Sequence, residues 1–335
     1  MAELLHLNDL RVHFKTFAGE VQAVRGVTFS VQKGQVVAIV GESGCGKSVT
    51  AHTIMKLIPT PPGKIISGSI FFDGEDLAPK TNEEMAKIRG KEIGMIFQDP
   101  MTSLNPTLTI GNQLGEVLKV HQGLTGEAVR LRMVELLKMV GINQPERRLK
   151  QYPHEFSGGM RQRVLIAMAI ACNPKLLIAD EPTTALDVTI QAQIMELLKD
   201  LQHQLQMSVV LITHDLGVVA GFSERVVVMY AGKVVEEGTT EEVFYNARHP
   251  YTWGLIKSVP RLNQDRSEPL APIPGRPPDL INPPPGCAFW PRCGQAMKIC
   301  TLHEPPEVVF SDGHRVSCWL EAEEVKKMSV KVAGV

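Results

Sequence analysis

The sequence predicts an α/β fold organised around a phosphate-binding loop, and three observations lead to this prediction. Residues 41–48, Gly-Glu-Ser-Gly-Cys-Gly-Lys-Ser, match the pattern G-x-x-x-x-G-K-[ST]. The apolar run 36–40 before them indicates a buried strand, and residues 49–58 after them indicate a helix. Two more apolar runs, 176–180 and 208–213, end in polar residues, as strands that lead to a ligand site do.

The loop 41–48 has the chemistry of a nucleotide site. Its glycines allow successive backbone N–H groups to surround a phosphate at the positive end of a helix dipole. We expect Lys47 to reach the β- and γ-phosphates and the Ser48 hydroxyl to hold Mg²⁺. A glycine turn before an ordinary helix is the alternative, but the flanking strand and helix argue against it. The chain is therefore expected to bind a nucleoside triphosphate.

Composition limits the class of protein. A chain of 335 residues has room for about two domains, and its net charge of −1 gives no indication of a nucleic-acid partner. The N-terminus lacks a basic segment followed by an apolar stretch, and no apolar run approaches the roughly 18 residues needed to cross a bilayer. We therefore expect a cytoplasmic protein, for which any membrane role must come through partners.

The residues on either side of the loop indicate an antiparallel lobe. Residues 4–14 and 21–31 alternate as strands do, and residues 63–76 indicate a hairpin. Phe14 lies on one of these strands and is the candidate to stack on an adenine ring. Packing of its ring against the lobe is an equally good interpretation.

The middle of the chain combines a strand with a helical region. Residues 93–97 indicate a strand that ends at Gln98, whose amide is expected to ligate Mg²⁺ and to contact an attacking water. Residues 107–150 indicate helices, with Thr125 a candidate N-cap and Gly141 a candidate C-cap.

A second candidate anion site follows this region. Ser157, Gly158 and Gly159 open an apolar helix and offer exposed N–H groups together with a hydroxyl. Two helix starts that bind phosphate are difficult to use on one nucleotide unless they come from different copies. The pattern therefore predicts a dimer.

Two carboxylates end the strand that precedes residue 182. We expect Asp180 to hold Mg²⁺, usually through water, and Glu181 to polarise the attacking water. A solvated acidic turn is the alternative, and the preceding phosphate loop makes it a poor one. The strand 208–213 brings His214 to the edge where ligands bind, and there it is expected to hydrogen-bond the γ-phosphate.

In this order, the motifs resemble those of the nucleotide-binding subunit of an ABC transporter. The resemblance implies a P-loop NTPase cassette over residues 1–240, with a RecA-like core, an antiparallel β lobe and a helical subdomain at about 100–172. The signature at 156–160 departs from Leu-Ser-Gly-Gly-Gln at Phe156 and Met160.

The resemblance also implies roles for individual residues. Those implied to bind ATP through the loop are Gly41, Ser43, Gly44, Cys45, Gly46, Lys47, Ser48 and Val49. Those implied to hold Mg²⁺ are Ser48, Gln98 and Asp180, and those implied to catalyse hydrolysis are Glu181, His214 and Gln98. Those implied to contact the nucleotide of the opposite subunit, or to support the dimer seam, are Ser157, Gly158, Gly159 and Asp187.

Composition changes after residue 237. Prolines interrupt residues 248–284 so often that neither a sheet nor a long helix is expected, and an extended arm is predicted. The patterns His-Pro-Tyr at 249–251 and Pro-Gly-Cys at 285–287 resemble the C-terminal extension of oligopeptide and dipeptide importer ATPases, and are most similar to the D-type ATPases of dipeptide importers. On this resemblance, residues 241–325 form the extension and residues 326–335 a tail.

Four cysteines gather in the extension: Cys287, Cys293, Cys300 and Cys318. A reducing cytosol makes two disulfides a poor explanation, and four thiolates in a small arm are expected to hold a metal centre. Zinc sites use closer pairs than these, whereas iron–sulfur sites accept more varied spacing. Related subunits carry a [4Fe–4S] cluster on this pattern. The cluster is therefore the first expectation, zinc the second and free buried thiols the third.

The resemblance implies an ATPase, peripheral to the cytoplasmic face of the cell membrane, that powers the import of di- and oligopeptides. The partners it implies are a second ABC ATPase subunit that is a paralogue in a heterodimer, two transmembrane permease subunits and an extracytoplasmic peptide-binding protein. Import of a nickel chelate or another small solute, and a catalytically weak half of a heterodimer, are the alternatives. A soluble ABC ATPase acting on ribosomes or DNA would normally carry two tandem cassettes or a long coiled coil, and this sequence shows neither.

Overall fold

The structure is a computed structural model, and it describes residues 2–99, 103–184, 186–259, 272–310, 313–323 and 325. It divides into two compact units. The first comprises residues 1–4, 31–36 and 79–212, and the second comprises residues 5–30, 37–78 and 213–335. The predicted tail, 326–335, lies outside the described residues.

The first unit contributes three parallel strands in the order β8-β7-β6. They are β6 (Ile93–Ile96), β7 (Leu176–Asp180) and β8 (Ser208–Thr213). Every residue of β7 and β8 is buried, as expected for strands that are covered on both faces. The three strands predicted in this part of the sequence are confirmed.

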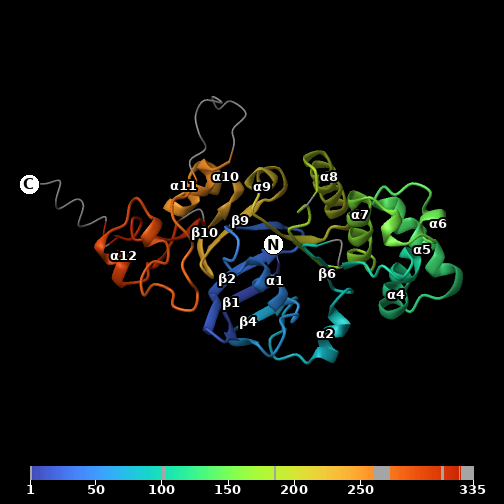
Figure 1. The fold of residues 1–335 in the computed structure, drawn as a ribbon, viewed down its shortest axis with the longest axis horizontal. Helices are drawn as coiled ribbons and strands as arrows, with labels where there is room; N and C mark the ends of the chain where they lie inside the picture. Colours follow the sequence, from blue (N-terminus) through green and yellow to red (C-terminus); the bar gives the residue numbers. More distant parts are fainter. Residues whose placement is uncertain are drawn as a thin grey trace, which may run out of the picture. The chain divides into compact units, whose positions relative to one another are not determined.

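The helices of the first unit gather mainly around α7. They are α2 (Asn82–Ile88), α4 (Ile110–Gln122), α5 (Gly126–Met139), α6 (Pro145–Arg148), α7 (Gly158–Ala169) and α8 (Val188–Leu205), with a 3-10 turn at Pro153–Glu155. Figure 1 shows α4 and α5 beside α7, with α6 farther from it. Thr125 precedes α5 as predicted, although its side chain makes no capping hydrogen bond, and Gly141 follows the helix with a left-handed φ of 71°.

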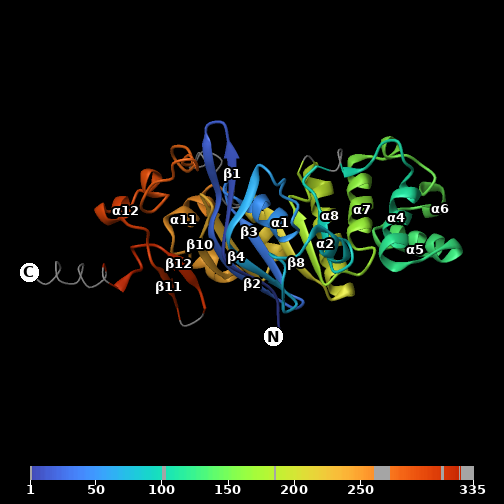
Figure 2. The ribbon, with the colours of Figure 1, turned by 90° about the horizontal axis from the view of Figure 1, so that it is seen from below.

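The second unit contains the predicted antiparallel lobe, with strand order β2-β1-β4-β5. Its strands are β1 (Glu3–Thr16), β2 (Gly19–Gln32), β4 (Gly63–Phe72) and β5 (Glu75–Asp76). Figure 2 shows β1, β2 and β4 running together.

The same unit carries a second set of paired strands, in the order β11-β12-β10-β9-β3. These are β3 (Val36–Val40), β9 (Arg225–Tyr230), β10 (Lys233–Thr239), β11 (Glu307–Val309) and β12 (Arg315–Ser317). The strands β3 and β9 are parallel, and the remaining neighbours are antiparallel. The strands β9 to β12 were not predicted from the sequence. Of these, β11 and β12 come from the C-terminal segment and extend the pairing beyond β10 (Figure 2).

The helices of the second unit are short. They are α1 (Lys47–Ile54), α9 (Leu216–Phe222), α10 (Thr240–Tyr245), α11 (Pro250–Lys257) and α12 (Lys298–Leu302), with a 3-10 turn at Trp290–Arg292. Of the predicted extended arm, residues 272–284 form neither helix nor strand, whereas α11 lies within it, so the prediction was wrong for residues 250–257. Residues 260–271 of the arm lie outside the described residues. Among the described residues, no helix combines the length and the hydropathy needed to cross a membrane.

An aromatic cluster anchors the C-terminal segment within the second unit. The rings of Tyr230 on β9 and Tyr251 on α11 have centroids 4.5 Å apart. Phe289, from the proline-rich segment, meets the ring of Tyr230 edge-on at 5.2 Å and that of Tyr251 at 5.4 Å. All three side chains are buried, and aromatic pairs in this geometry stabilise a core beyond the area they bury. The segment is therefore packed onto the sheet rather than detached from it.

Candidate functional site

The phosphate loop joins β3 to α1 with a backbone that only glycine accommodates at two positions. A β-carbon on Gly41 would lie 2.2 Å from the carbonyl oxygen of Met229, and one on Gly46 would lie 2.5 Å from that of Ala23. Both residues also have positive φ angles, 150° and 100°. Gly46 is the N-cap of α1, so the loop delivers its N–H groups at the start of a helix as predicted.

Lys47 folds back over the loop that it follows. Its side chain is almost fully buried, and its ammonium donates hydrogen bonds to the carbonyl oxygens of Gly41 (2.7 Å) and Glu42 (3.0 Å). The thiol of Cys45 is also buried, which raises its pKa and keeps it protonated at neutral pH. Cys45 therefore contributes shape and backbone to the loop rather than thiolate chemistry.

The C-terminal segment contacts the loop directly at Glu42. The Glu42 backbone N–H donates to the hydroxyl of Tyr251 at 2.8 Å. The Arg292 guanidinium donates to both carboxylate oxygens of Glu42, at 2.6 and 2.8 Å, and this bond raises the pKa of Arg292. The sequence analysis noted Tyr251 only as part of a pattern and missed both Glu42 and Arg292 as members of the site. Nothing in the sequence around Glu42 or around Arg292 indicates that the two residues are in contact.

The predicted acidic edge lies in the first unit, after β7. Asp180 is buried at the end of the strand, and Glu181 follows with a left-handed φ of 47°. The Glu181 carboxylate accepts hydrogen bonds from the Gln98 amide (2.8 Å) and the Thr184 hydroxyl (2.9 Å). Strained backbone of this kind persists where the surroundings impose it, often at functional sites. The structure thus brings together Gln98 and Glu181, which the sequence analysis linked only through their expected roles.

The signature residues start α7 as predicted. Ser157 is the exposed N-cap of this helix, and its hydroxyl accepts a hydrogen bond from the backbone N–H of Met160 at 3.4 Å. A β-carbon on Gly159 would lie 2.8 Å from Ile190, so the helix start approaches α8 closely. Asp187 is exposed and caps α8 by accepting from the Ile190 N–H at 3.0 Å. Their roles toward an opposite subunit stay predictions.

Phe14 lies within the antiparallel lobe, and His214 lies just after β8. Phe14 is partly buried on β1 opposite Gly63 of β4, and its ring covers that glycine so closely that a β-carbon there would lie at 2.8 Å. His214 is exposed after β8, immediately before Asp215, which caps α9. Adenine stacking and γ-phosphate binding stay predictions for these two side chains.

The four cysteines of the extension line one small void of about 10 Å³, together with Phe289, Trp290 and Trp319. Burial raises the pKa of Cys287 to about 11 and that of Cys318 to about 12, so both thiols are protonated at neutral pH. Among the described residues, no group of three or more His, Cys, Asp or Glu side chains has the geometry to hold a metal ion. The donor set therefore fits a metal centre in number and convergence but not in spacing, and the expected cluster is unsupported by the geometry.

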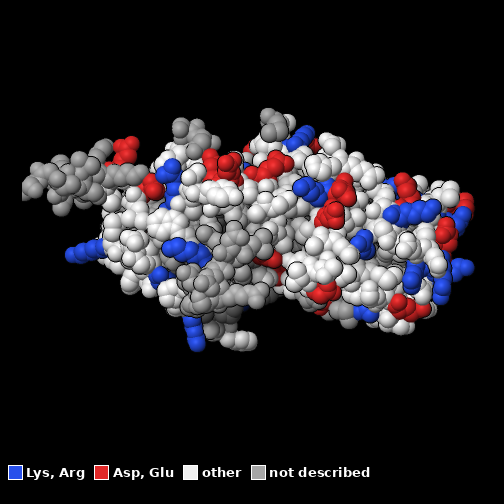
Figure 3. All heavy atoms as spheres, turned by 90° about the horizontal axis from the view of Figure 1, so that it is seen from above, with Lys and Arg blue, Asp and Glu red and all other residues white. Residues whose placement is uncertain are grey.

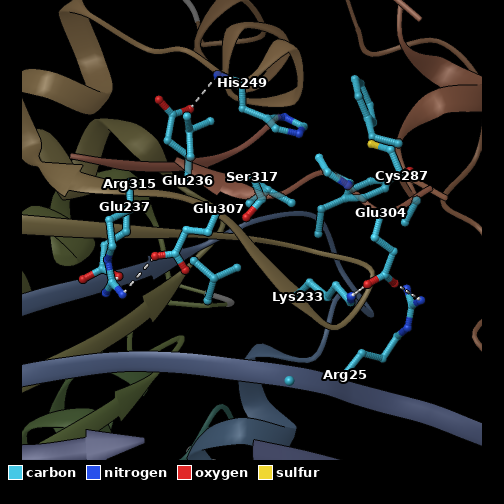
Figure 4. A pocket seen from close by; sticks show the side chains of 18 of the residues that line it. Arg25, Lys233, Glu236, Glu237, His249, Cys287, Glu304, Glu307, Arg315 and Ser317 are labelled. Carbon is cyan, nitrogen blue, oxygen red and sulfur yellow. Dashed lines mark hydrogen bonds and ion pairs between the residues drawn. The ribbon is translucent and has the colours of Figure 1, made fainter. Parts of the chain in front are cut away.

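A larger cavity, of about 210 Å³, lies between β2, β10 and the C-terminal segment within the second unit. Figure 4 shows Glu304 between Lys233 and Arg25, with its carboxylate 2.5 Å from the ammonium and 3.5 Å from the guanidinium. Charges of both signs line this cavity, so it does not suit a polyphosphate. The molecular face in Figure 3 likewise carries basic and acidic side chains interspersed.

Two family models match the chain. Residues 24–184 match the model described as ABC transporter, and residues 235–300 match the model described as oligopeptide/dipeptide transporter, C-terminal region. The fold and the phosphate loop thus define an ATPase of the ABC class, with the mixed α/β sheets of its cassette.

Curated relatives and solved structures agree with this class. The oligopeptide transport ATP-binding protein OppD of Bacillus subtilis is 60% identical over 98% of this chain and 92% of its own length. The dipeptide transport ATP-binding protein DppD of the same organism is 55% identical, over 97% of each chain. The ATP-binding cassette MJ0796, solved as a dimer in a post-hydrolysis state bound to ADP and Pi, is 33% identical with a TM-score of 0.63, over 70% of this chain and 98% of that one. The chain therefore belongs to the family of oligopeptide and dipeptide transport ATP-binding proteins.

Proposed function

We propose that this chain hydrolyses ATP to power the import of di- and oligopeptides through partner permease subunits. The observation that carries the hydrolytic part is the Glu181 carboxylate, held by Gln98 and Thr184 at the end of a buried strand. The peptide cargo is supported by the match of residues 235–300 and by relatives named for oligopeptide and dipeptide transport.

Each residue has a defined task in the proposed mechanism. The loop N–H groups and Lys47 hold the β- and γ-phosphates, and Mg²⁺, when bound by Ser48, Asp180 and Gln98, neutralises charge that develops on the phosphates. Glu181 accepts a hydrogen bond from the attacking water. This bond raises the electron density on the oxygen of the water. Gln98 orients the Glu181 carboxylate, to which its amide is already hydrogen-bonded.

The proposed working unit is a head-to-tail dimer with a paralogous ATPase. Ser157, Gly158 and Gly159 of one subunit would cap the γ-phosphate held by the other, with Asp187 at the seam. ATP must bind the closed dimer better than the open one for its binding to move the partners. The partners we propose are two transmembrane permease subunits and an extracytoplasmic peptide-binding protein, with this chain peripheral on the cytoplasmic face of the membrane.

The proposed division of the chain is a cassette over residues 1–240 and an extension over residues 241–325. The end of β10 at Thr239 supports this boundary, and β12 of the proposed extension pairs with β10 of the proposed cassette.

Transport in a reconstituted system tests the function. The chain would be co-expressed with candidate permease subunits and a candidate second ATPase subunit, and placed in vesicles with a peptide-binding protein inside. We expect ATP-dependent movement of a labelled dipeptide or pentapeptide, lost in Lys47→Ala. Equal ATP-driven transport of a nickel chelate that peptides do not compete for would overturn the proposed cargo.

We also propose that the four clustered cysteines hold one inorganic group, with an iron–sulfur cluster ahead of zinc. The convergence of the four side chains on one void supports this proposal. Because burial raises the pKa of Cys287 and Cys318, binding of the group would release protons from these two thiols. Anaerobic purification should give a brown protein with about four irons per chain, lost in Cys293→Ser and retained in the control Cys172→Ser. A colourless protein without bound metal would favour free thiols.

A further inference from the structure

The phosphate loop carries a negative charge of its own. Glu42 occupies its second position, and its carboxylate is about a quarter exposed, with a relative side-chain accessibility of 27%. A carboxylate beside a bound triphosphate repels it, and a loop built to bind phosphate gains nothing from that charge. The structure offsets the charge from a distant part of the chain.

Arg292 is held in place for this pairing. Its side chain is only 3% exposed, and beyond the two bonds to Glu42 it donates to the carbonyl oxygen of Pro274 (2.8 Å) and the hydroxyl of Tyr230 (3.3 Å). Its guanidinium also lies 6.0 Å from the centre of the Phe289 ring. A two-pronged arginine–carboxylate pair fixed by further acceptors is geometrically specific, unlike an exposed ion pair between mobile side chains.

Tyr251 fixes the backbone of the same loop residue. Its hydroxyl accepts the Glu42 N–H, which is therefore directed away from a bound phosphate. Tyr251 is fully buried between the rings of Tyr230 and Phe289, so its hydroxyl has little freedom to move. The side chain and the backbone of Glu42 are thus both held by residues of the C-terminal segment.

We propose that Arg292 and Tyr251 are positioning residues of the nucleotide site: Arg292 cancels the charge of Glu42, and Tyr251 sets the loop backbone in the shape that accepts a polyphosphate. The C-terminal segment is then part of the ATP site as well as a family-specific addition. This inference rests on the proposed function and adds two residues to its machinery.

Nucleotide binding to the purified chain tests the proposal. A fluorescent ATP analogue with Mg²⁺ would be titrated at low salt and at about 0.5 M salt, where the screening length falls to about 4 Å. Arg292→Ala should raise Kd about tenfold at low salt, and the difference should shrink at high salt. Adding Glu42→Gln to Arg292→Ala should restore most of the affinity, because no charge is then left to repel the nucleotide. Tyr251→Phe should raise Kd about fivefold at both salt concentrations.

A matched control separates positioning from general damage to the fold. Arg315 pairs with the buried Glu237 in the same unit and does not contact the loop, so Arg315→Ala should leave Kd within about twofold of the original. Thermal unfolding would be measured for every variant. If Arg292→Ala does not fold, Arg292→Gln removes the charge, keeps hydrogen-bond donors and carries the same expectations.

The outcomes separate this inference from the proposed function. Unchanged affinity in the Arg292 variants, or failure of Glu42→Gln to restore binding, would overturn the charge-cancelling role. Unchanged affinity in Tyr251→Phe would overturn the backbone role. Failure of the original chain to bind ATP would instead overturn the proposed function.

Discussion

At the scale of single residues, Glu181 combines chemistry with an unusual conformation. Its φ of 47° is left-handed, and its carboxylate is fixed by two side chains from the same unit. A carboxylate that acts on water must be held in a fixed direction, and these bonds hold it. The sequence could place Glu181 at the end of a strand because the apolar run before it is continuous. It could not reveal the strain, which depends on how the chain leaves β7.

Replacing this carboxylate by an amide tests its role. Glu181→Gln should lower the rate of ATP hydrolysis by about 10²- to 10⁴-fold, because the neutral amide is too weak a base to take a proton from the attacking water. Affinity for ATP should persist, since Lys47 and the loop are unchanged. Phosphate release and nucleotide titration measure the two quantities, and Glu196→Gln, on an exposed turn of α8, is the control. Normal hydrolysis in Glu181→Gln would remove Glu181 as the base.

At the scale of elements, α11 shows how one helix start organises the second unit. His249 caps it, with its Nδ1 accepting the Tyr251 N–H at 3.0 Å. The His249 N–H donates to the buried carboxylate of Glu236 at 3.0 Å, which also accepts from His314 at 2.8 Å. The helix that carries Tyr251 to the phosphate loop is thus tied to β10 and β12.

The cap makes stability depend on pH. Burial lowers the pKa of His249 from 6.5 to about 4, so the unfolded chain takes up a proton at a higher pH than the folded chain. Stability should be complete above pH 6.5, fall as the pH drops toward 4 by about 3 kcal/mol, and then level off. Urea unfolding of the original chain and of His249→Asn, whose side chain can still cap, measures this difference. An equal pH dependence in both proteins would contradict the assignment to His249.

Elements built from neighbouring residues were predictable, and those built from distant ones were not. The succession of β3, the phosphate loop and α1 could be predicted, because a buried apolar run and a glycine pattern lie within about twenty residues of each other. The strands β11 and β12 are three residues each, too short to show a period, and β12 exists because β10 offers it an edge about eighty residues earlier. The contact of Arg292 with Glu42 could not be predicted either, because the two residues lie far apart in the sequence.

At the scale of the whole molecule, the proposed dimer assigns the signature residues to the nucleotide of a second ATPase subunit. Ser157 and Gly158 are exposed at the start of α7, where they are available to another chain. Ser157→Arg should therefore leave ATP binding to the isolated chain unchanged and reduce hydrolysis by the assembled pair about 100-fold, because it removes a γ-phosphate contact and blocks the approach.

The matched variant for this test is Thr125→Arg. It changes another exposed N-cap position, on α5, and should alter neither binding nor hydrolysis. Binding by the isolated chain and hydrolysis by the complex would be measured separately. A loss of ATP binding in isolated Ser157→Arg would mean that the signature serves its own subunit, against the proposed dimer.

Glu42 and Arg292 lie 250 positions apart in the sequence, yet they meet within one unit of the fold. An acidic residue at the second position of the loop therefore places a negative charge beside the nucleotide, and here a remote arginine neutralises this charge. A neutral residue at that position would leave no charge to neutralise. Across related chains we expect the two positions to covary, with the arginine retained where the loop is acidic and free to drift where it is not. An alignment could then identify, without a structure, the relatives whose C-terminal segment contributes residues to the nucleotide site.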